Sequence, residues 1–422
     1  MIDIKLLRNN FDEIKQNIDR RHKSYPSLEI FKAKDTEWKK IATQLQTLAT
    51  DRNVCSDKIA KLIKENNIDE VNKIKEHVKS LKNDIDELQK RANELEHELK
   101  IILFSIPNVL DPSVPDGKDE NENVEVKKEF SIPKFNFTPL SHYDLGIKNK
   151  WLDFERGVKV AGSRMYYVTG FGAQLMRALR NFTLDLHINA GYEEVLPPVI
   201  MNDKPFYGLG KLPLFEEDMY QTTNRQFLSG TEEHPITALY MDETIDSKTL
   251  PIKLTSSLVS FRKEAGSAGK DTKGILRVHQ FYNTELVNFC LPDESWKLLD
   301  EMVNEAQKVL DLLKIPYRTI LLCSGDTGDA SAKTYDIEVW VPSENKYREI
   351  SSCSNVLDYQ ACGMHIKYSN NGETGYVHTL NGTGTSLNRL WIAIVENFQN
   401  EDGTINIPEV LKPYLNTKIY EQ

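Results

Sequence analysis

The chain has 422 residues, of which 40% are hydrophobic and 27% are charged, a composition typical of a globular protein with two or three domains. It contains no apolar run long enough to span a membrane and no signal-peptide pattern at its start, so we expect no membrane contact. The five cysteines are scattered and form no CxxC pair. They therefore predict free thiols in a reducing, cytoplasmic compartment, with neither disulfides nor a zinc site.

Charge is distributed unevenly along the chain. The formal net charge is −10, which by itself argues against a nucleic-acid partner. Residues 1–100, however, carry 21 Lys and Arg against 19 Asp and Glu, whereas the remainder carries 32 against 44. A nearly neutral arm with local basic clusters can still bind a phosphate backbone, while the acidic body repels it outside selected places.

Residues 1–103 form the first predicted domain, and the clearest periodicity lies from about residue 30 onward. Apolar residues recur there in steps of three and four in two stretches, separated by the short polar segment 64–70, which predicts two antiparallel helices in a coiled-coil hairpin. A dimerising coiled coil or a helical bundle is the structural alternative. The two apolar stripes include Trp38, Ile41, Leu45, Leu48, Ile59 and Leu62, then Val71, Ile74, Val78, Leu81, Ile85, Leu88, Ala92, Leu95, Leu99 and Ile102.

Residues 104–134 contain four prolines and an acidic run, and we expect them to form a linker. From residue 135 to 422 the pattern changes to interleaved helix and strand. Helical spacing extends over 174–187, and alternating apolar residues at 318–322 and 336–340 predict strands. Because no regular βαβ unit is visible, the predicted fold class is α+β, with an antiparallel sheet flanked by helices.

Three short segments could carry chemistry. Residues 191–200 read as a helix running into a strand. Residues 261–281 place Arg262 and Glu264 on one face of a strand, then a glycine- and lysine-rich turn, and then Phe281, which offers a stacking surface. Residues 382–389 place glycines before a helix whose first turn holds Arg389. Each segment alone is also typical of a purely structural element.

Together, and in this order, the three segments resemble motifs 1, 2 and 3 of the class II aminoacyl-tRNA synthetases. The finer resemblance is to the seryl-tRNA synthetase family and runs from residue 1 to about residue 415. It rests on the motif 2 segment from Phe261 to Gly274 and on several further stretches, namely residues 3–8, 105–108, 153–156, 332–336, 348–355 and 377–382.

The resemblance implies a site for serine. Thr231, Glu232 and Glu233 match the loop that recognises the α-amino group, Glu285 matches the glutamate at the serine hydroxyl, and Thr383 reaches the same hydroxyl with Asn381 beside it. A site built to bind a hydroxyl rejects alanine, because alanine leaves buried polar groups unpaired.

The resemblance also implies a site for ATP and Mg²⁺. Arg262 grips the α-phosphate and with Arg389 is expected to be catalytic; it contacts the serine carboxylate as well. Phe281 stacks under the adenine, and Glu349 and Ser352 bind Mg²⁺, which prefers oxygen ligands. The full set of expected ATP contacts is Arg262, Lys263, Glu264, Arg277, Phe281, Glu349, Ile350, Ser351, Ser352 and Arg389.

The implied reaction has two steps and needs no protein nucleophile. The serine carboxylate attacks the α-phosphorus of ATP to give seryl-adenylate, and the 3′-terminal ribose of tRNA(Ser) then accepts the seryl group. The helical hairpin is expected to bind the long variable arm of tRNA(Ser) through backbone and shape. Motif 1 implies a homodimer.

Some residues depart from the family pattern. Cys362-Gly363 stand where two arginines are usual, and residues 385–388 and 282–284 are also atypical. Two alternatives therefore stay open. One is a synthetase-like paralogue that charges an acceptor other than tRNA, and the other is a non-catalytic regulator that binds tRNA or a nucleotide.

Overall fold

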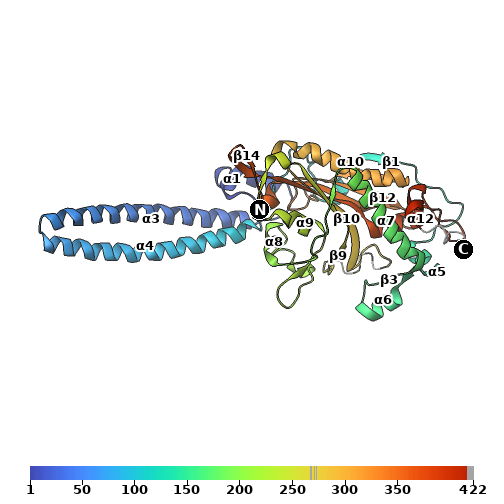
Figure 1. The fold of residues 1–422 in the computed structure, drawn as a ribbon, viewed down its shortest axis with the longest axis horizontal. Coiled ribbons are helices and arrows are strands. Elements are labelled where there is room, and N and C mark those ends of the chain that lie inside the picture. Colours follow the sequence, from blue (N-terminus) through green and yellow to red (C-terminus); the bar gives the residue numbers. More distant parts are fainter. Residues whose placement is uncertain (267–268, 270, 272, 416–422) are drawn as a thin grey trace. The chain divides into compact units, whose positions relative to one another are not determined.

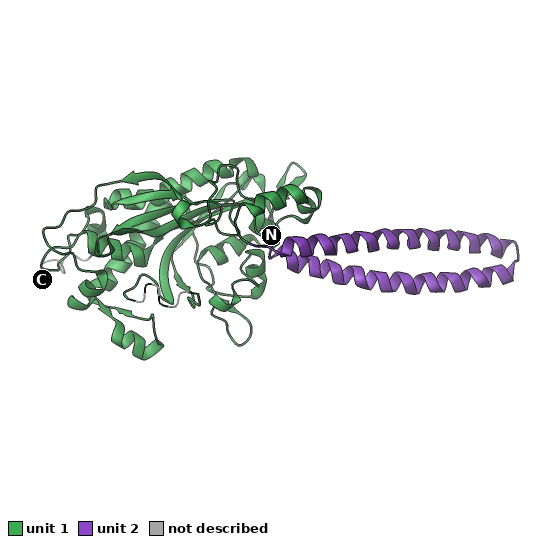
Figure 2. Ribbon diagram, turned by 180° about the vertical axis from the view of Figure 1, so that it is seen from behind, with its two compact units in different colours: residues 1–23, 107–422 green, residues 24–106 purple. Residues whose placement is uncertain are grey.

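The computed structural model describes residues 1–266, 269, 271 and 273–415, and they form two compact units. The small unit is residues 24–106, and the large unit combines residues 1–23 with the chain from residue 107 onward (Figure 2). The expected boundaries at 103 and 134 differ from this division. Residues 1–23 pack within the large unit, and the expected linker contributes strand β1 (Val124–Glu129) to its sheet.

The small unit is the predicted antiparallel hairpin. Helix α3 (Ser27–Lys64) and helix α4 (Ile68–Leu103) run side by side and are joined by three residues (Figure 1). Ile41, Ala92 and Leu95 are buried in the seam, and ion pairs such as Arg91–Glu37 at 2.9 Å cross beside it. The hairpin predicted from the periodicity is therefore confirmed, and its apolar stripes are buried where the two helices pack together.

The large unit is built on a mixed sheet whose described part has nine strands, in the order β1-β11-β12-β13-β16-β10-β8-β4 with β9 paired to β10. All these pairs are antiparallel except β4–β8, which confirms the predicted α+β class. The strands are β4 (Glu193–Glu194), β8 (Ile252–Ser256), β9 (Val259–Phe261), β10 (Gln280–Cys290), β11 (Tyr317–Leu321), β12 (Lys333–Val341), β13 (Lys346–Leu357) and β16 (His378–Ser386).

Three long helices cover this sheet and form the main core with it. They are α7 (Gly170–Asn189), α10 (Ser295–Leu313) and α12 (Leu387–Asn397), all packed on sheet strands (Figure 1). Trp391 is fully buried, and its indole N–H donates to the Gly172 carbonyl at 3.1 Å. None of the described helices is both long and apolar enough to cross a membrane.

Shorter elements surround the sheet. The helices are α1 (Ile4–Asn9), α2 (Phe11–Asp19), α5 (His142–Lys148), α6 (Phe154–Ala161), α8 (Asp203–Gly208), α9 (Glu233–Thr237) and α11 (Tyr359–Met364). Small sheets pair β2 (Leu152–Asp153) with β3 (Tyr167–Val168), pair β5 (Ile200–Met201) with β6 (Phe227–Leu228), and join β7 (Thr244–Asp246), β14 (Lys367–Asn370) and β15 (Glu373–Tyr376).

Arg21 joins the N-terminal segment to the rest of the large unit. Its side chain is fully buried, and its guanidinium donates to main-chain carbonyls of four residues at 2.7–3.2 Å. We expect Arg21→Met to lower the free energy of unfolding by about 3 kcal/mol, because buried carbonyls lose their donors. Urea denaturation measures this, with the exposed Lys5→Ala as control; equal stability of both variants would contradict the role. The four acceptors are Asn108, Thr327, Gly328 and Ser331.

Candidate functional site

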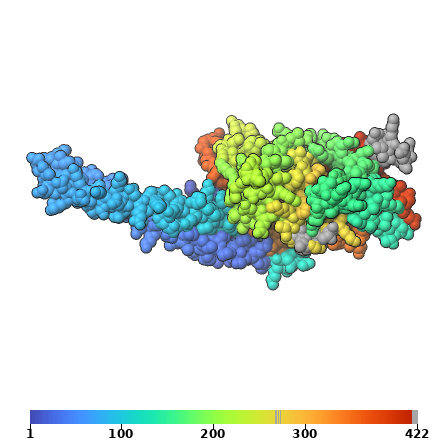
Figure 3. All heavy atoms as spheres, turned by 90° about the horizontal axis from the view of Figure 1, so that it is seen from below, coloured from blue at the N-terminus to red at the C-terminus, as the bar shows by residue number. Residues whose placement is uncertain are grey.

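A cavity of about 1180 Å³ opens on the sheet of the large unit. It is lined from β10, β12, β13 and β16 and from the loop before α9. In the space-filling view, the segment coloured yellow, which contains β9 and β10, lies between the yellow-green and green segments of the same unit (Figure 3). Eight expected site residues line this cavity: Thr231, Glu233, Arg262, Glu285, Glu349, Ser352, Asn381 and Thr383.

The Glu285 carboxylate forms the floor of one end of the cavity. Thr231 Oγ1 and Thr383 Oγ1 each donate to Glu285 Oε1 at 3.1 Å, and Asn283 Nδ2 donates to the same oxygen at 3.0 Å. The pairing of Glu285 with Thr383 across β10 and β16 brings two of these side chains together. Burial, and secondarily the nearby Glu233 carboxylate, raises the pKa of Glu285 to about 7. Among the described residues no donor reaches Oε2, so this oxygen is available to a ligand.

Glu233 lies beside Glu285 at the start of α9. Gln360 Nε2 donates to Glu233 Oε1 at 2.8 Å, and the Glu233 main-chain N–H donates to Thr231 Oγ1 at 3.2 Å. Two carboxylates at one end of a cavity favour a ligand that brings a positive charge and a hydroxyl. Glu232, by contrast, is 1% exposed and does not line the cavity.

The structure therefore places the Glu232 side chain outside the cavity, whereas the resemblance implied that it contacts the α-amino group. Of the three residues Thr231, Glu232 and Glu233 at the start of α9, the first and third line the cavity and Glu232 does not. Burial, with Glu285 as the second cause, raises the pKa of Glu232 to about 8. The Glu232 carboxyl is thus mainly protonated at neutral pH, because burial disfavours the charged form of an acid.

A second cavity, of about 170 Å³, adjoins the first and shares Arg262, Glu349 and Thr383 with it. The Arg262 guanidinium lies 5.1 Å from the centre of the Phe281 ring, and its Nε donates to the Gly230 carbonyl at 2.9 Å. The second cavity adds the other expected contacts Glu264, Arg277, Phe281, Ile350 and Arg389. An aromatic face with three arginines around it suits a planar base carrying phosphates.

Two of the three arginines of the second cavity, Arg277 and Arg389, are paired with carboxylates. Arg277 Nη1 lies 2.7 Å from Glu264 Oε2, and Arg389 Nη1 lies 3.3 Å from Glu349 Oε2 while also donating to the Glu349 carbonyl at 2.6 Å. Such pairs hold the guanidinium groups in place, and an anionic ligand can compete for their donors.

A β-bulge brings the expected metal ligands to one face. On β13, Ser351 lies opposite Ile337 and Glu349 lies opposite Glu338, so Ile350 is the extra residue. Glu349 and Ser352, three positions apart, therefore both reach the first cavity. Asp336 pairs with Ser352, and burial, followed by the charge of Glu349, raises the pKa of Asp336 well above its ordinary value.

Two residues that were expected to contact ATP, Lys263 and Ser351, lie outside both cavities. Lys263 extends over the Tyr220 ring at 6.0 Å, and Ser351 is buried with its hydroxyl donating to the Thr383 carbonyl. Lys263 lies after the end of β9 (Val259–Phe261), so the predicted strand does not extend through Arg262 and Glu264, and the Lys263 side chain turns toward Tyr220. Ser351 is in β13 and alternates with its neighbour Ser352, which lines the first cavity. Of the glycine- and lysine-rich turn, Ser267, Ala268, Lys270 and Thr272 lie outside the described residues.

Sequence reasoning missed three polar residues of the cavity region. Asn283 donates to Glu285, Gln360 donates to Glu233, and Asp336 lines the first cavity. The alternation of β10 places Asn283 on the same face as Glu285 two residues on, which was a usable signal. No local pattern predicts Gln360, because its partner lies 127 positions away.

Comparison with known proteins agrees with this geometry. Residues 216–398 match the tRNA synthetase class II core domain (G, H, P, S and T), and residues 1–110 match the seryl-tRNA synthetase N-terminal domain. The chain is 43% identical to the serine–tRNA ligase of Ureaplasma parvum, with 98% of this chain and 100% of the relative covered. The chain belongs to the seryl-tRNA synthetase family. The serine–tRNA ligase of Methanosarcina barkeri is likewise 43% identical, over 98% of this chain and 97% of its own length.

Solved structures of the seryl-tRNA synthetase family have the same fold. The enzyme of Pyrococcus horikoshii, complexed with ATP, superposes with a TM-score of 0.94 at 35% identity, covering 98% of each chain. The cytoplasmic serine–tRNA ligase of Naegleria fowleri, in complex with AMP, gives a TM-score of 0.89 at 29% identity over 98% of this chain and 97% of its own. The chain is therefore a ligase of class II, with the hairpin and the core of the family both present.

Proposed function

We propose that this chain activates serine with ATP to form seryl-adenylate and transfers the seryl group to the 3′ end of tRNA(Ser). The observation that carries the proposal is the Glu285 pocket. One carboxylate oxygen is held by three donors while the second is left for a ligand, and Glu233 lies beside it.

The pocket matches serine group by group. The Glu233 carboxylate pairs with the α-ammonium, and Glu285 accepts a hydrogen bond from the side-chain hydroxyl, next to Thr383 and Asn381. Arg262, across the same cavity, pairs with the serine carboxylate. Alanine would fill this pocket without a donor for Glu285, and that leaves a buried acceptor unpaired.

The second cavity holds ATP. The adenine stacks on Phe281, with Glu264 toward its polar edge, and Arg277 and Arg389 neutralise the phosphates. Arg262 lies in both cavities, so it can bind the serine carboxylate and the α-phosphate together. The carboxylate attacks the α-phosphorus and pyrophosphate leaves in line. Catalysis then consists of positioning and charge stabilisation by Arg262 and Arg389.

The residues around Glu349 fit a magnesium ion. Glu349 lies opposite Glu338, Asp336 lies opposite Ser352, and all four line the first cavity, where Arg318 pairs with Glu338 and Arg389 with Glu349. The Asp336 Oδ1 atom is buried without a hydrogen-bond partner among the described residues. Glu349 and Ser352 would hold Mg²⁺, which would supply positive charge to the phosphates.

The rest of the chain serves the second step. The hairpin would lie along the variable arm of tRNA(Ser), and residues 1–103 then act as the tRNA-binding part, 104–134 as the connection and 135–422 as the catalytic part. Two copies would associate through the motif 1 segment, where Leu196 is 71% and Ile200 is 50% exposed. The free cysteines suit a cytoplasmic location.

ATP–pyrophosphate exchange with a panel of single amino acids tests the activation step. We expect exchange with serine and none above background with alanine or threonine. Exchange with another amino acid would reassign the pocket, and absence of exchange with all of them would favour the non-catalytic alternative. That alternative is disfavoured because Arg262, Glu285 and Arg389 all lie in the cavities.

Serine binding is expected to depend on pH through Glu285. The Glu285 pKa of about 7 must fall when serine binds, because the hydroxyl and the ammonium of serine both favour the ionised carboxylate. Binding therefore releases a proton. The KM for serine should fall by about fivefold from pH 6 to pH 7 and by about a further twofold to pH 8, where it levels off. Glu285→Gln should flatten this profile; an unchanged profile in that variant would assign the titration elsewhere.

A further inference from the structure

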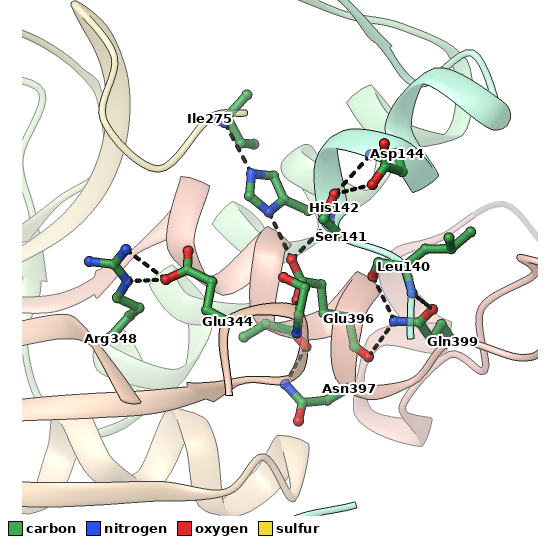
Figure 4. Close-up of polar contacts among 12 residues, drawn as sticks. Leu140, Ser141, His142, Asp144, Ile275, Glu344, Arg348, Glu396, Asn397 and Gln399 are labelled. Carbon is green, nitrogen blue, oxygen red and sulfur yellow. Dashed lines mark hydrogen bonds and ion pairs between the residues drawn. The ribbon is translucent and has the colours of Figure 1, made fainter. Parts of the chain in front are cut away.

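A buried polar pair lies next to the segment that leads into the second cavity. His142, the first residue of α5, is 5% exposed, and Glu396, near the end of α12, is fully buried. Glu396 Oε1 accepts from the His142 main-chain N–H at 2.8 Å and lies 2.8 Å from the ring atom Nδ1 (Figure 4). A buried carboxylate is costly unless its oxygens are satisfied, so this pairing is a strong constraint on both elements.

The hydrogen bonds define the state of the imidazole. The main-chain N–H of Ile275 donates to His142 Nε2 at 3.3 Å, so Nε2 carries no proton. The proton of the neutral ring is therefore on Nδ1, and Nδ1–H donates to Glu396. Figure 4 shows the ring between Ile275 on one side and Glu396 on the other.

His142 contacts Gly274 and Ile275, which follow the glycine- and lysine-rich turn of motif 2. A Cβ atom on Gly274, whose φ is +78°, would lie 2.0 Å from His142 Nε2, so the ring and the loop backbone are in direct contact. Ile275 is fully buried in the main core of the large unit. Arg277 follows two residues later and lines the second cavity.

The same carboxylate reaches two other segments of the ATP site. Glu396 Oε2 accepts from the Ser343 amide at 3.0 Å, in the turn between β12 and β13, and β13 carries Glu349. Arg389 precedes Glu396 by two turns of α12. One buried group therefore joins the loop of Arg277, the helix of Arg389 and the hairpin of Glu349.

We propose that His142, supported by Glu396, is a positioning residue for ATP in the adenylation step. It contacts no substrate. It sets the place of Arg277 relative to Arg389 by holding the Ile275 amide, and small displacements of charged groups at a reacting centre are costly. The proposal rests on the proposed function, because it assigns the second cavity to ATP.

Two variants separate the two ring hydrogen bonds. His142→Asn can keep the donor toward Glu396 but has no acceptor at the Nε2 position. His142→Gln can keep an acceptor for Ile275 but loses the Nδ1 donor. Exchange kinetics should show that His142→Asn raises the KM for ATP at least tenfold, while the KM for serine changes less than threefold. His142→Gln should stay within threefold of wild type for both substrates.

A double variant and a variant on the loop side test whether the effect of His142 passes through Arg277. In an Arg277→Ala background, His142→Asn should add less than twofold to the KM for ATP, since its effect passes through Arg277. An unchanged KM for ATP in His142→Asn, or an equal rise for ATP and serine, would overturn the proposal. If His142→Asn does not fold, Gly274→Ala applies the same test from the loop side. Failure of wild-type exchange would instead overturn the proposed function.

Discussion

Replacing Arg262 by alanine is expected to lower serine-dependent ATP–pyrophosphate exchange by about 1,000-fold, the scale typical of losing a charge-stabilising donor at a reacting centre. Arg262 is the arginine that lines both cavities, and it lies over Phe281. Its guanidinium can therefore touch the serine carboxylate, the α-phosphate and the face of the adenine site. The loss should fall mainly on kcat, because the contact strengthens as charge moves to the phosphate oxygens.

Lys263→Ala is the matched control for Arg262→Ala. Lys263 is the next residue and carries the same charge, but its side chain lies toward Tyr220 and outside both cavities. We expect its exchange rate to remain within threefold of wild type. Equal losses in the two variants would show that net positive charge matters and that the position of Arg262 does not.

Removing the Glu285 carboxylate should abolish the preference for serine over alanine. In Glu285→Ala, we expect the ratio of kcat/KM for serine to that for alanine to fall by at least about 100-fold, because discrimination rests on a buried acceptor that alanine cannot satisfy. The chain should still fold, although Thr231, Thr383 and Asn283 lose a shared acceptor. Exchange measured with each amino acid gives the ratio.

Glu232→Gln is the control for Glu285→Ala. Glu232 is a buried carboxyl nearby, yet it does not line the cavity, so its replacement should leave the ratio unchanged within threefold. If Glu285→Ala kept the wild-type ratio, the hydroxyl would be recognised by another group. If Glu232→Gln lowered the serine-to-alanine ratio of kcat/KM as strongly, the general polarity of this region would account for the preference for serine.

Much of the fold could be predicted because its signals are local. The hairpin follows from two apolar stripes and a short polar turn, and the strands β11 and β12 follow from period-two alternation. The place of residues 1–23 could not be predicted in this way. It depends on Arg21 meeting carbonyls more than 80 positions away, and no periodicity reports such a contact.

The candidate site was predicted mainly from resemblance, and its errors have a local cause. Lys263 and Ser351 were included as neighbours of Arg262 and Glu349, although Lys263 lies beyond the end of β9 with its side chain over Tyr220, and Ser351 alternates with Ser352 on β13. The joint placement of Glu349 and Ser352 needs the bulge at Ile350, which a strict alternation would not allow. His142 was missed because its role depends on Ile275 and Glu396, both distant in sequence.

Charging of tRNA with labelled serine tests the central claim most directly. The substrate is a tRNA(Ser) with its long variable arm, compared with the same tRNA after the arm is shortened. We expect the full-length tRNA to accept serine and the shortened one to lose at least tenfold in kcat/KM, since the hairpin then has no helix to lie along. Serine-dependent exchange without charging of either tRNA would contradict the proposed transfer of serine to tRNA(Ser). It would favour a paralogue with another acceptor and direct attention to Cys362-Gly363.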